Sequence, residues 1–251
     1  MEQAHDKTRN IRLTLSYDGT NYHGWQSQPN AVSVEETLKR ALERILNHDV
    51  KIYAGGRTDA GVHAMGQVVN FVTGRGIDAT SLTRGLNSLL PRDIRVKDGR
   101  DAAEGFHARY SARSKTYVYC ILNQAHNSPF LSRYVLHMPY SLDIASMKEA
   151  ARLILGEHDF SAFKKKGEVC GSPVREVRRA GVATKGNKVF VIIEATGFLR
   201  YMVRNIVGTL LLVGRERIGK DTFGQILESR QREQAGPNAP AQGLFLREIK
   251  Y

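Results

Sequence analysis

The sequence is poor in cysteine and in long apolar runs, and each of these shortages excludes a class of protein. Its 251 residues include 2 cysteines, Cys120 and Cys170, and 1 tryptophan. Neither cysteine belongs to a Cys-x-x-Cys pair, which argues against a zinc ribbon, a dithiol redox centre and a disulfide-rich secreted scaffold. Two isolated cysteines are typical of a cytoplasmic protein with reduced thiols.

Membrane and export signals are also missing from the sequence. The longest apolar stretch, residues 206–213, is far shorter than the ~20 residues that a membrane-spanning helix needs. Residues 1–7 have no apolar core, so they do not fit a secretory signal. No basic amphipathic segment stands out as a membrane anchor. We therefore expect a protein that acts in the cytoplasm without contacting a membrane.

Positive charge is what the sequence has in excess. The 37 lysines and arginines outweigh the 25 acidic residues, which gives a formal net charge of +12 and a pI of about 9.8. This balance favours a polyanionic partner such as nucleic acid, although many soluble enzymes are also basic. The basic residues interrupt foldable segments, so we expect a folded surface to carry them. They cluster at Arg109, Arg113 and Lys115, at residues 164–166, and at Arg175, Arg178 and Arg179.

The first hundred residues predict two helices among four strands. Alternating apolar residues and short β-prone runs predict the strands at 10–17, 51–54, 67–73 and 94–97. Ser33 followed by Glu36 forms a capping box, which begins a helix that reaches about Asn47. A second helix is expected at residues 80–90. Residues 55–66, which are rich in glycine, are expected to form a loop.

The remaining residues predict a second set of strands and helices. The expected strands are residues 115–122, 174–184, 188–195 and 244–251, the middle two joined as a hairpin at 185–187. One helix is expected to begin after Asp143 and end at Gly156. An unusually apolar helix is expected at 198–213, and a shorter one capped by Asp221. The composition of residues 234–242 predicts a surface loop.

These two successive sets of elements predict an α+β protein made of two α/β halves, each with a mainly antiparallel sheet. We place the boundary near residue 105. Residues 1–105 then form the half that carries the glycine-rich loop, and residues 106–251 form the other half.

The charged side chains best suited to a catalytic site lie in the glycine-rich loop, Ala54-Gly-Gly-Arg-Thr-Asp-Ala-Gly-Val-His63. Its glycines permit tight turns and a close approach of a ligand. If the loop is extended, Arg57 and Asp59 face the same side, and the guanidinium lowers the pKa of the carboxylate. Such an ionised carboxylate can act as a nucleophile or an electrostatic stabiliser. The competing interpretation is an aspartate that only bonds its own turn.

Other readings of the same region do not fit. A phosphate-binding P-loop needs a Lys-Ser/Thr pair that this loop lacks. Residues 74–79 have the spacing of a dinucleotide fingerprint, but the strand before them contains Gln67 and Asn70, whereas a buried parallel strand is continuously apolar. Asp59 and His63 lack the third neighbouring ligand that a catalytic zinc requires.

Two features of the second half could complete a site with this loop. Arg204 lies inside the most apolar helix, where an unpaired guanidinium is unfavourable. Either it reaches solvent beside Arg200, or it pairs with a carboxylate of the other half, for which Asp59 is the natural candidate. Tyr117 and Tyr119 share one face of a strand, where tyrosines pack across strands or, on an RNA-facing sheet, stack on bases.

Taken in order, these segments resemble the tRNA pseudouridine synthase A family. Gly56-Arg-Thr-Asp-Ala-Gly-Val-His63 is similar to its catalytic signature. Further matching segments are Tyr17-Asp-Gly-Thr-x-Tyr-x-Gly-Trp-Gln26, Gln67-Val-Val-Asn-Phe71, Phe106-His-Ala-Arg109, Met202-Val-Arg-Asn-Ile-Val-Gly208 and Gly243-Leu-Phe-Leu246. The sequence departs slightly from the family at Gly55, where many relatives have alanine or serine.

The resemblance implies that uridine is converted to pseudouridine at positions 38, 39 and 40 of the tRNA anticodon stem-loop. Asp59 matches the nucleophilic aspartate and Tyr117 the tyrosine that stacks on the target uracil. Arg57 matches the arginine that helps to hold the flipped nucleotide, and Arg204 the arginine that pairs with the catalytic carboxylate. The resemblance also implies two ferredoxin-like halves around a central, mainly antiparallel sheet, a positively charged cleft, a homodimer, no cofactor and no catalytic metal.

Two other functions remain open at this stage. A non-catalytic RNA-binding module would gain nothing from Asp59, because a carboxylate repels phosphates. A carboxylate-dependent hydrolase would need a second catalytic carboxylate or an activated water site, and neither is evident. For the isomerase, attack on C1′, addition to uracil C6 and a glycal route all require an ionised Asp59.

Overall fold

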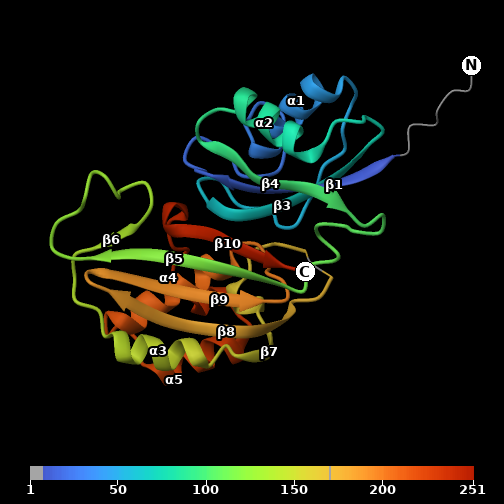
Figure 1. Ribbon diagram of the computed structural model, residues 1–251. Helices are drawn as coiled ribbons and strands as arrows, with labels where there is room; N and C mark the ends of the chain where they lie inside the picture. Colours follow the sequence, from blue (N-terminus) through green and yellow to red (C-terminus); the bar gives the residue numbers. More distant parts are fainter. Residues whose placement is uncertain (1–7, 170) are drawn as a thin grey trace, which may run out of the picture. The chain divides into compact units, whose positions relative to one another are not determined.

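The computed structural model describes residues 8–169 and 171–251, so the expectations for residues 1–7 and for Cys170 lie outside the described residues. The chain divides into two compact units: residues 8–113 together with Leu246–Tyr251, and residues 114–245 apart from residue 170. The division at residue 105 expected from the sequence assigns residues 106–113 and the last six residues differently. Each unit combines strands and helices (Figure 1), as the predicted α+β class requires.

The first unit has the strand order of a ferredoxin-like motif. Its elements are β1 (Arg9–Tyr17), α1 (Val34–Leu46), β2 (Tyr53–Ala54), β3 (His63–Thr73), α2 (Ala79–Leu89) and β4 (Ile94–Ala102). The strands lie in the order β4-β1-β3, with β2 paired to β3, and all these pairs are antiparallel. This is the β-α-β-β-α-β pattern with strand order 4-1-3-2.

Helices α1 and α2 lie on one side of this sheet (Figure 1), and their apolar stripes form its core. The predicted helix start is confirmed at its N-cap, because the Ser33 Oγ accepts a hydrogen bond from the Glu36 N–H at 3.2 Å. The helix ends at Asn47, which adopts a left-handed conformation with φ of 56°. Leu38, Leu42, Leu82 and Leu86 are fully buried.

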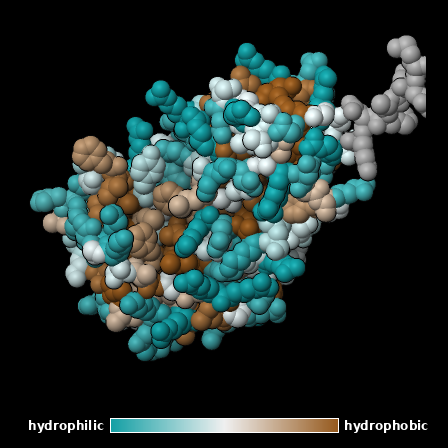
Figure 2. Space-filling model, viewed as in Figure 1, coloured by the Kyte–Doolittle hydropathy of each residue, from teal (hydrophilic) through white to brown (hydrophobic). Residues whose placement is uncertain are grey.

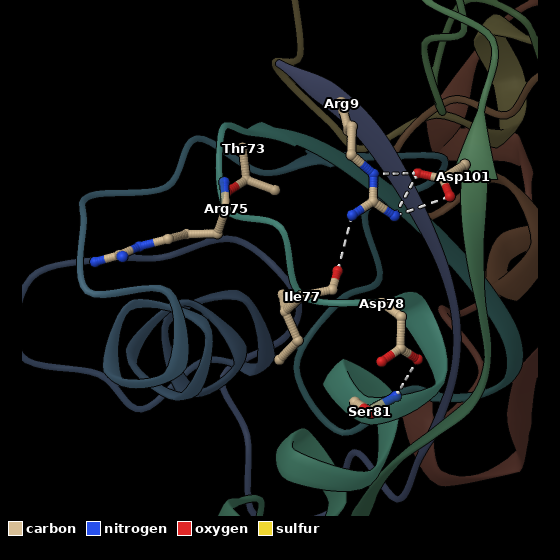
Figure 3. Close-up of polar contacts among 7 residues, drawn as sticks. All are labelled: Arg9, Thr73, Arg75, Ile77, Asp78, Ser81 and Asp101. Atoms are coloured by element: carbon tan, nitrogen blue, oxygen red, sulfur yellow. Dashed lines mark hydrogen bonds and ion pairs between the residues drawn. The ribbon is translucent and has the colours of Figure 1, made fainter. Parts of the chain in front are cut away.

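The glycine-rich connection from β3 to α2 is a structural link, as Figure 3 shows. The Arg9 Nη1 donates to the Ile77 carbonyl at 2.8 Å, while its Nε and Nη2 bond the Asp101 carboxylate at 2.8 and 2.9 Å. The Asp78 Oδ1 accepts from the Ser81 N–H at 2.9 Å and so caps α2. The strand before this connection is antiparallel to β1, which confirms that the segment is not part of a dinucleotide-binding unit.

The second unit contributes further, mainly antiparallel strands, with helices on one side of them (Figure 1). Its elements are β5 (Ser114–Asn123), β6 (Leu136–Met138), α3 (Ile144–Arg152), β7 (Gly156–Asp159), β8 (Val174–Lys185), β9 (Lys188–Ala195), α4 (Met202–Gly214) and α5 (Lys220–Ser229). The order is β5-β9-β8-β7, and β6 is parallel to β5. The last strand, β10 (Leu244–Lys250), begins in this unit and passes into the first unit at Leu246.

The surface of the second unit includes a hydrophobic segment. Figure 2 shows hydrophobic side chains gathered over the loop that joins β5 to β6, at the left of the view. Phe130 on this loop is 88% exposed, so it adds nothing to the core. Among the described residues, no helix is both long enough and apolar enough to cross a bilayer.

Several element boundaries differ from the sequence-based expectation. β3 begins at His63 rather than near residue 67, because Ala64 already pairs with Tyr17 across an irregularity in β1. α3 ends at Arg152, and Gly156 begins β7 with φ of 92° instead of ending the helix. The early start of β3 shortens the glycine-rich loop, which was expected at residues 55–66, to residues 55–62.

The apolar helix of the second unit also starts later than expected. α4 begins at Met202 because Tyr201 has a left-handed backbone, with φ of 66°, which no helix can continue through. α5 begins after Gly219, so Asp221 lies in its first turn rather than at its cap.

The expected surface loop at 234–242 is exposed at residues 234, 237 and 240, and it also packs against α4. A Cβ added at Gly208 would lie 1.7 Å from the Pro237 carbonyl oxygen, so the two backbones touch. The Gly236 N–H donates to the Thr209 Oγ1 at 2.9 Å, and Ala239 is buried. The segment is therefore a surface loop that is fixed to the helix at Gly236 and Ala239.

Candidate active site

The signature loop, residues 55–62, leaves β2 and enters β3 in the first unit. The residues of the opening motif, 17–26, hold its backbone. The Trp25 N–H donates to the Thr58 carbonyl at 3.0 Å, and the Gly61 N–H donates to the Tyr22 carbonyl at 3.3 Å. The catalytic signature and the 17–26 segment, two of the segments that carry the resemblance, are therefore packed together as one structural feature.

A buried glutamine fixes the start of this loop. The Gln67 side chain is 0% exposed. Its Nε2 donates to the Gly56 carbonyl at 2.6 Å, and its Oε1 accepts from the Gly56 N–H at 3.2 Å. The amide thus satisfies both backbone groups of one loop residue, which would otherwise be buried without partners.

Thr58 anchors the middle of the loop in the core. Its Oγ1 lies 2.8 Å from the Tyr17 Oη. Burial raises the pKa of Tyr17 from 10.0 to about 12, so the phenol keeps its proton well into the alkaline range. Thr58 is buried, whereas Arg57 is exposed and Asp59 is partly exposed. This alternation agrees with an extended segment in which Arg57 and Asp59 face away from the core.

Two glycines of the opening motif allow the loop to approach. Gly24 has φ of 93°, and a Cβ there would lie 2.6 Å from the Thr58 carbonyl oxygen and 3.0 Å from the Asp59 carbonyl carbon. A Cβ at Gly19 would lie 2.1 Å from the Val62 carbonyl oxygen. Larger side chains at either position would displace the backbone that carries Asp59.

His63 is a buried structural group at the end of the loop. Its Nδ1 accepts a hydrogen bond from the Gly19 N–H at 3.0 Å and lies 3.1 Å from the Asp18 Oδ1. Within residues 8–169 and 171–251, no cluster of three or more histidine, cysteine or acidic side chains could hold a metal ion. Through its contacts with Gly19 and Asp18, His63 helps to fix the opening motif against the loop.

Arg204 lies on α4 in the second unit and is held by the segment that packs on that helix. Its Nε donates to the Ala239 carbonyl at 2.7 Å, and the Ala239 N–H donates to the Arg204 carbonyl at 3.1 Å. Its guanidinium carbon lies 5.2 Å from the centre of the Tyr201 ring. A backbone carbonyl is a partner that the sequence analysis did not foresee.

Tyr117 and Tyr119 both lie on β5 and are buried. The Tyr117 ring packs edge-on against Phe198, with ring centres 5.0 Å apart. The Tyr119 Oη donates to the Pro240 carbonyl at 2.7 Å, next to the residue that binds Arg204. The family resemblance assigns no role to Tyr119, yet Tyr119 anchors the segment that positions Arg204.

Asn70 is a second structural support whose role the sequence motifs did not reveal. Its Oδ1 accepts from the Ala108 N–H at 2.8 Å, and its Nδ2 donates to the Asn10 Oδ1 at 2.9 Å and to the Phe106 carbonyl at 3.2 Å. It fixes the Phe106–Arg109 motif to β3. A polar side chain in an alternating apolar strand is the signal that could have identified both Asn70 and Gln67.

Comparison with known proteins identifies the family. The sequence model of a family described as tRNA pseudouridine synthase matches residues 14–111 and 150–251. The chain belongs to this family. The tRNA pseudouridine synthase A of Thermoanaerobacter sp. (strain X514) is 46% identical over 243 residues, which cover 97% of this chain and 100% of the relative.

A second relative supports the same assignment. The protein of the same name from Acetivibrio thermocellus is 44% identical over 243 residues, with the same shares of each chain covered. The resemblance seen in the sequence motifs is thereby confirmed, as is the predicted α+β fold class. Membership makes this chain an isomerase, a tRNA pseudouridine synthase.

Proposed function

We propose that this enzyme converts uridine to pseudouridine at positions 38, 39 and 40 of the tRNA anticodon stem-loop. Family membership supports the reaction, and the motif resemblance supports these positions. The C1′–N1 bond breaks, the uracil turns, and C1′ joins C5; the C5 hydrogen leaves as a proton and N1 gains one. Because the product is an isomer of the substrate, the reaction needs no redox or group-transfer cofactor.

Asp59 is the catalytic carboxylate in this proposal. The observation that carries it is the way its loop is built: Gln67 fixes Gly56 and Tyr17 contacts Thr58, while Asp59 itself stays partly exposed. A carboxylate on so strongly anchored a backbone is pre-organised for chemistry. Attack on C1′, addition to C6 and glycal formation all begin from its ionised form.

Three further residues would assist Asp59, two by binding the substrate and one by pairing with the carboxylate. The target base must leave its helical stack, which costs a few kcal/mol. Tyr117 would stack on the uracil, and Arg57, which is exposed beside Asp59 in sequence, would hold the flipped nucleotide. Arg204 would pair with the Asp59 carboxylate and keep it ionised. Its own attachment to Ala239 supports a fixed position for the guanidinium within its unit.

The remaining proposals concern the state of the protein. We propose a homodimer that works in the cytoplasm with tRNA as its partner. The motif resemblance supports the dimer, and the net charge of +12 supports a polyanionic partner. The size of the purified protein in solution tests the dimer directly.

Mapping the product tests the proposed positions. An unmodified tRNA transcript with uridine at 38, 39 and 40 is incubated with the enzyme, and pseudouridine is located by carbodiimide labelling and primer extension. We expect signals at these three positions, each lost when that uridine is replaced by cytidine. Pseudouridine elsewhere in the tRNA, or at none of the three, would refute the assignment.

A further inference from the structure

Three aromatic rings, those of Tyr53, His107 and Tyr110, lie in a row on the first unit, with a cation at each end of the row. We call this row the aromatic file. None of its residues is assigned to the reaction. The aromatic file joins β2 to the turn at residues 106–111. The Tyr53 and His107 rings are centred 4.6 Å apart, and the His107 and Tyr110 rings 4.4 Å apart. The outermost ring, Tyr110, is 77% exposed. Burial of a core therefore does not account for it.

The two cations extend this file at both ends. The Lys51 Nζ lies 5.3 Å from the centre of the Tyr53 ring, and the Arg109 guanidinium carbon lies 5.6 Å from the centre of the Tyr110 ring. Both residues are exposed, and neither makes an ion pair with a carboxylate in the described part of the chain. Their charge is thus available to an anionic ligand.

The turn that presents Arg109 and Tyr110 is rigidly built. The His107 Nδ1 accepts from the Arg109 and Tyr110 N–H groups at 3.1 and 3.3 Å. The Ser111 N–H donates to the His107 carbonyl at 2.9 Å, and the His107 N–H donates to the Ser111 Oγ at 3.1 Å. The backbone that carries the Tyr110 ring is therefore fixed before any ligand arrives, which reduces the entropy lost on binding.

The file also lies beside the start of the signature loop. Tyr53 is two residues before Gly55, and a Cβ at Gly55 would lie 3.1 Å from the Ala108 carbonyl oxygen. The turn 106–111 and the loop that carries Asp59 are thus packed together within one unit. One RNA molecule can therefore contact both the aromatic file and the loop that carries Asp59.

We propose that Tyr110 stacks on an unpaired base of the tRNA, other than the target uridine, while Arg109 and Lys51 contact the phosphates on either side. Single-stranded nucleic acid is bound by this combination of exposed aromatic faces and flanking cations. A protein partner is less favoured, because the charges that flank the rings would have to be buried or matched. The inference rests on the proposed function, since it takes the same tRNA as ligand.

Variants of Tyr110 test the proposal through binding to an unmodified tRNA transcript. Tyr110→Ala should weaken the Kd about tenfold, or about 1.4 kcal/mol, as expected for the loss of one stacked base. Tyr110→Phe should retain the affinity, because it keeps the ring. Arg109→Ala should reduce the salt dependence of binding by about one phosphate contact. The melting temperature should not change, because Tyr110 is exposed.

A matched control comes from the second unit. Tyr140 is 60% exposed and also carries an arginine, with the Arg215 guanidinium carbon 5.0 Å from its ring centre. Tyr140→Ala should leave the Kd unchanged. If wild type makes no pseudouridine, the proposed function fails. The stacking proposal alone is overturned if wild type is active and the Tyr110→Ala variant binds tRNA as tightly as wild type. The same holds if Tyr110→Ala changes only the oligomeric state.

Discussion

Gln67 and Gly56 form a reciprocal pair: one side-chain amide both donates to and accepts from the backbone of a single loop residue. Gly56 lies three residues before Asp59 in the chain. At Gly56, the pair replaces the hydrogen bonds that a neighbouring strand would provide. The position of the proposed catalytic carboxylate thus depends on a neutral residue of β3.

Replacing Gln67 by leucine should therefore affect stability and activity together. Gln67→Leu keeps the volume but leaves the Gly56 N–H and carbonyl buried without partners, which costs about 1–3 kcal/mol for each unsatisfied group. Urea unfolding should show this loss, and kcat for pseudouridine formation should fall because the loop is released. The control is Gln28→Leu, at an exposed glutamine. Wild-type stability and rate in Gln67→Leu would contradict the proposed support.

Tyr17 should make stability depend on pH in the alkaline range. Its pKa is raised by burial from 10.0 to about 12. Because the folded state holds the proton more tightly, this contribution is fully present below pH 10 and is lost as pH rises toward 12. The whole effect amounts to about 3 kcal/mol.

Urea unfolding at pH 9 and pH 11 measures this effect. Wild type should lose more stability between the two values than Tyr17→Phe, which has no proton to release at this position. Subtracting the variant removes the contribution of the other titrating groups. Parallel losses in the two proteins would show that Tyr17 is not buried as described.

The contact between Gly208 and Pro237 predicts a second sensitive position, on α4. Gly208→Ala would push the 236–239 segment away, because the added Cβ would lie 1.7 Å from the Pro237 carbonyl oxygen. We expect a loss of about 1–3 kcal/mol from overpacking. Activity should also fall, because Ala239 binds Arg204. Unfolding and turnover measured on the same preparation would check both effects.

Gly224 on α5 provides the matched substitution. A Cβ there would make an ordinary contact, 3.5 Å from the Leu153 Cδ1. Gly224→Ala should be neutral or stabilising by up to about 1 kcal/mol, because alanine favours the helix. If both glycine variants behave alike, the close approach at Gly208 has no energetic importance.

Local signals were sufficient to predict much of this fold. Ser33 caps α1 as expected because the capping box needs residues three apart, and β1 follows from strict alternation. The hairpin between β8 and β9 likewise turns at Gly186, with φ of 58°. The signature loop was located correctly between two strands for the same reason, since glycine clusters interrupt strands locally.

Contacts between distant residues could not be predicted in this way. The Tyr119 Oη meets the Pro240 carbonyl 121 positions away, and nothing in either segment encodes the partner. The 234–242 segment has the composition of a surface loop, but the glycine at 208 lets it pack on α4. The left-handed Tyr201, which delays α4, is fixed by tertiary structure against its local propensity.

The most direct test of the whole account is tritium release from tRNA labelled at uridine C5, with wild type compared with Asp59→Ala. Release reports the loss of the C5 proton, so it follows the isomerisation itself. We predict release at background level in the variant, with tRNA affinity close to wild type, because a carboxylate adds nothing to phosphate binding. Equal release by both proteins would contradict the central role of Asp59.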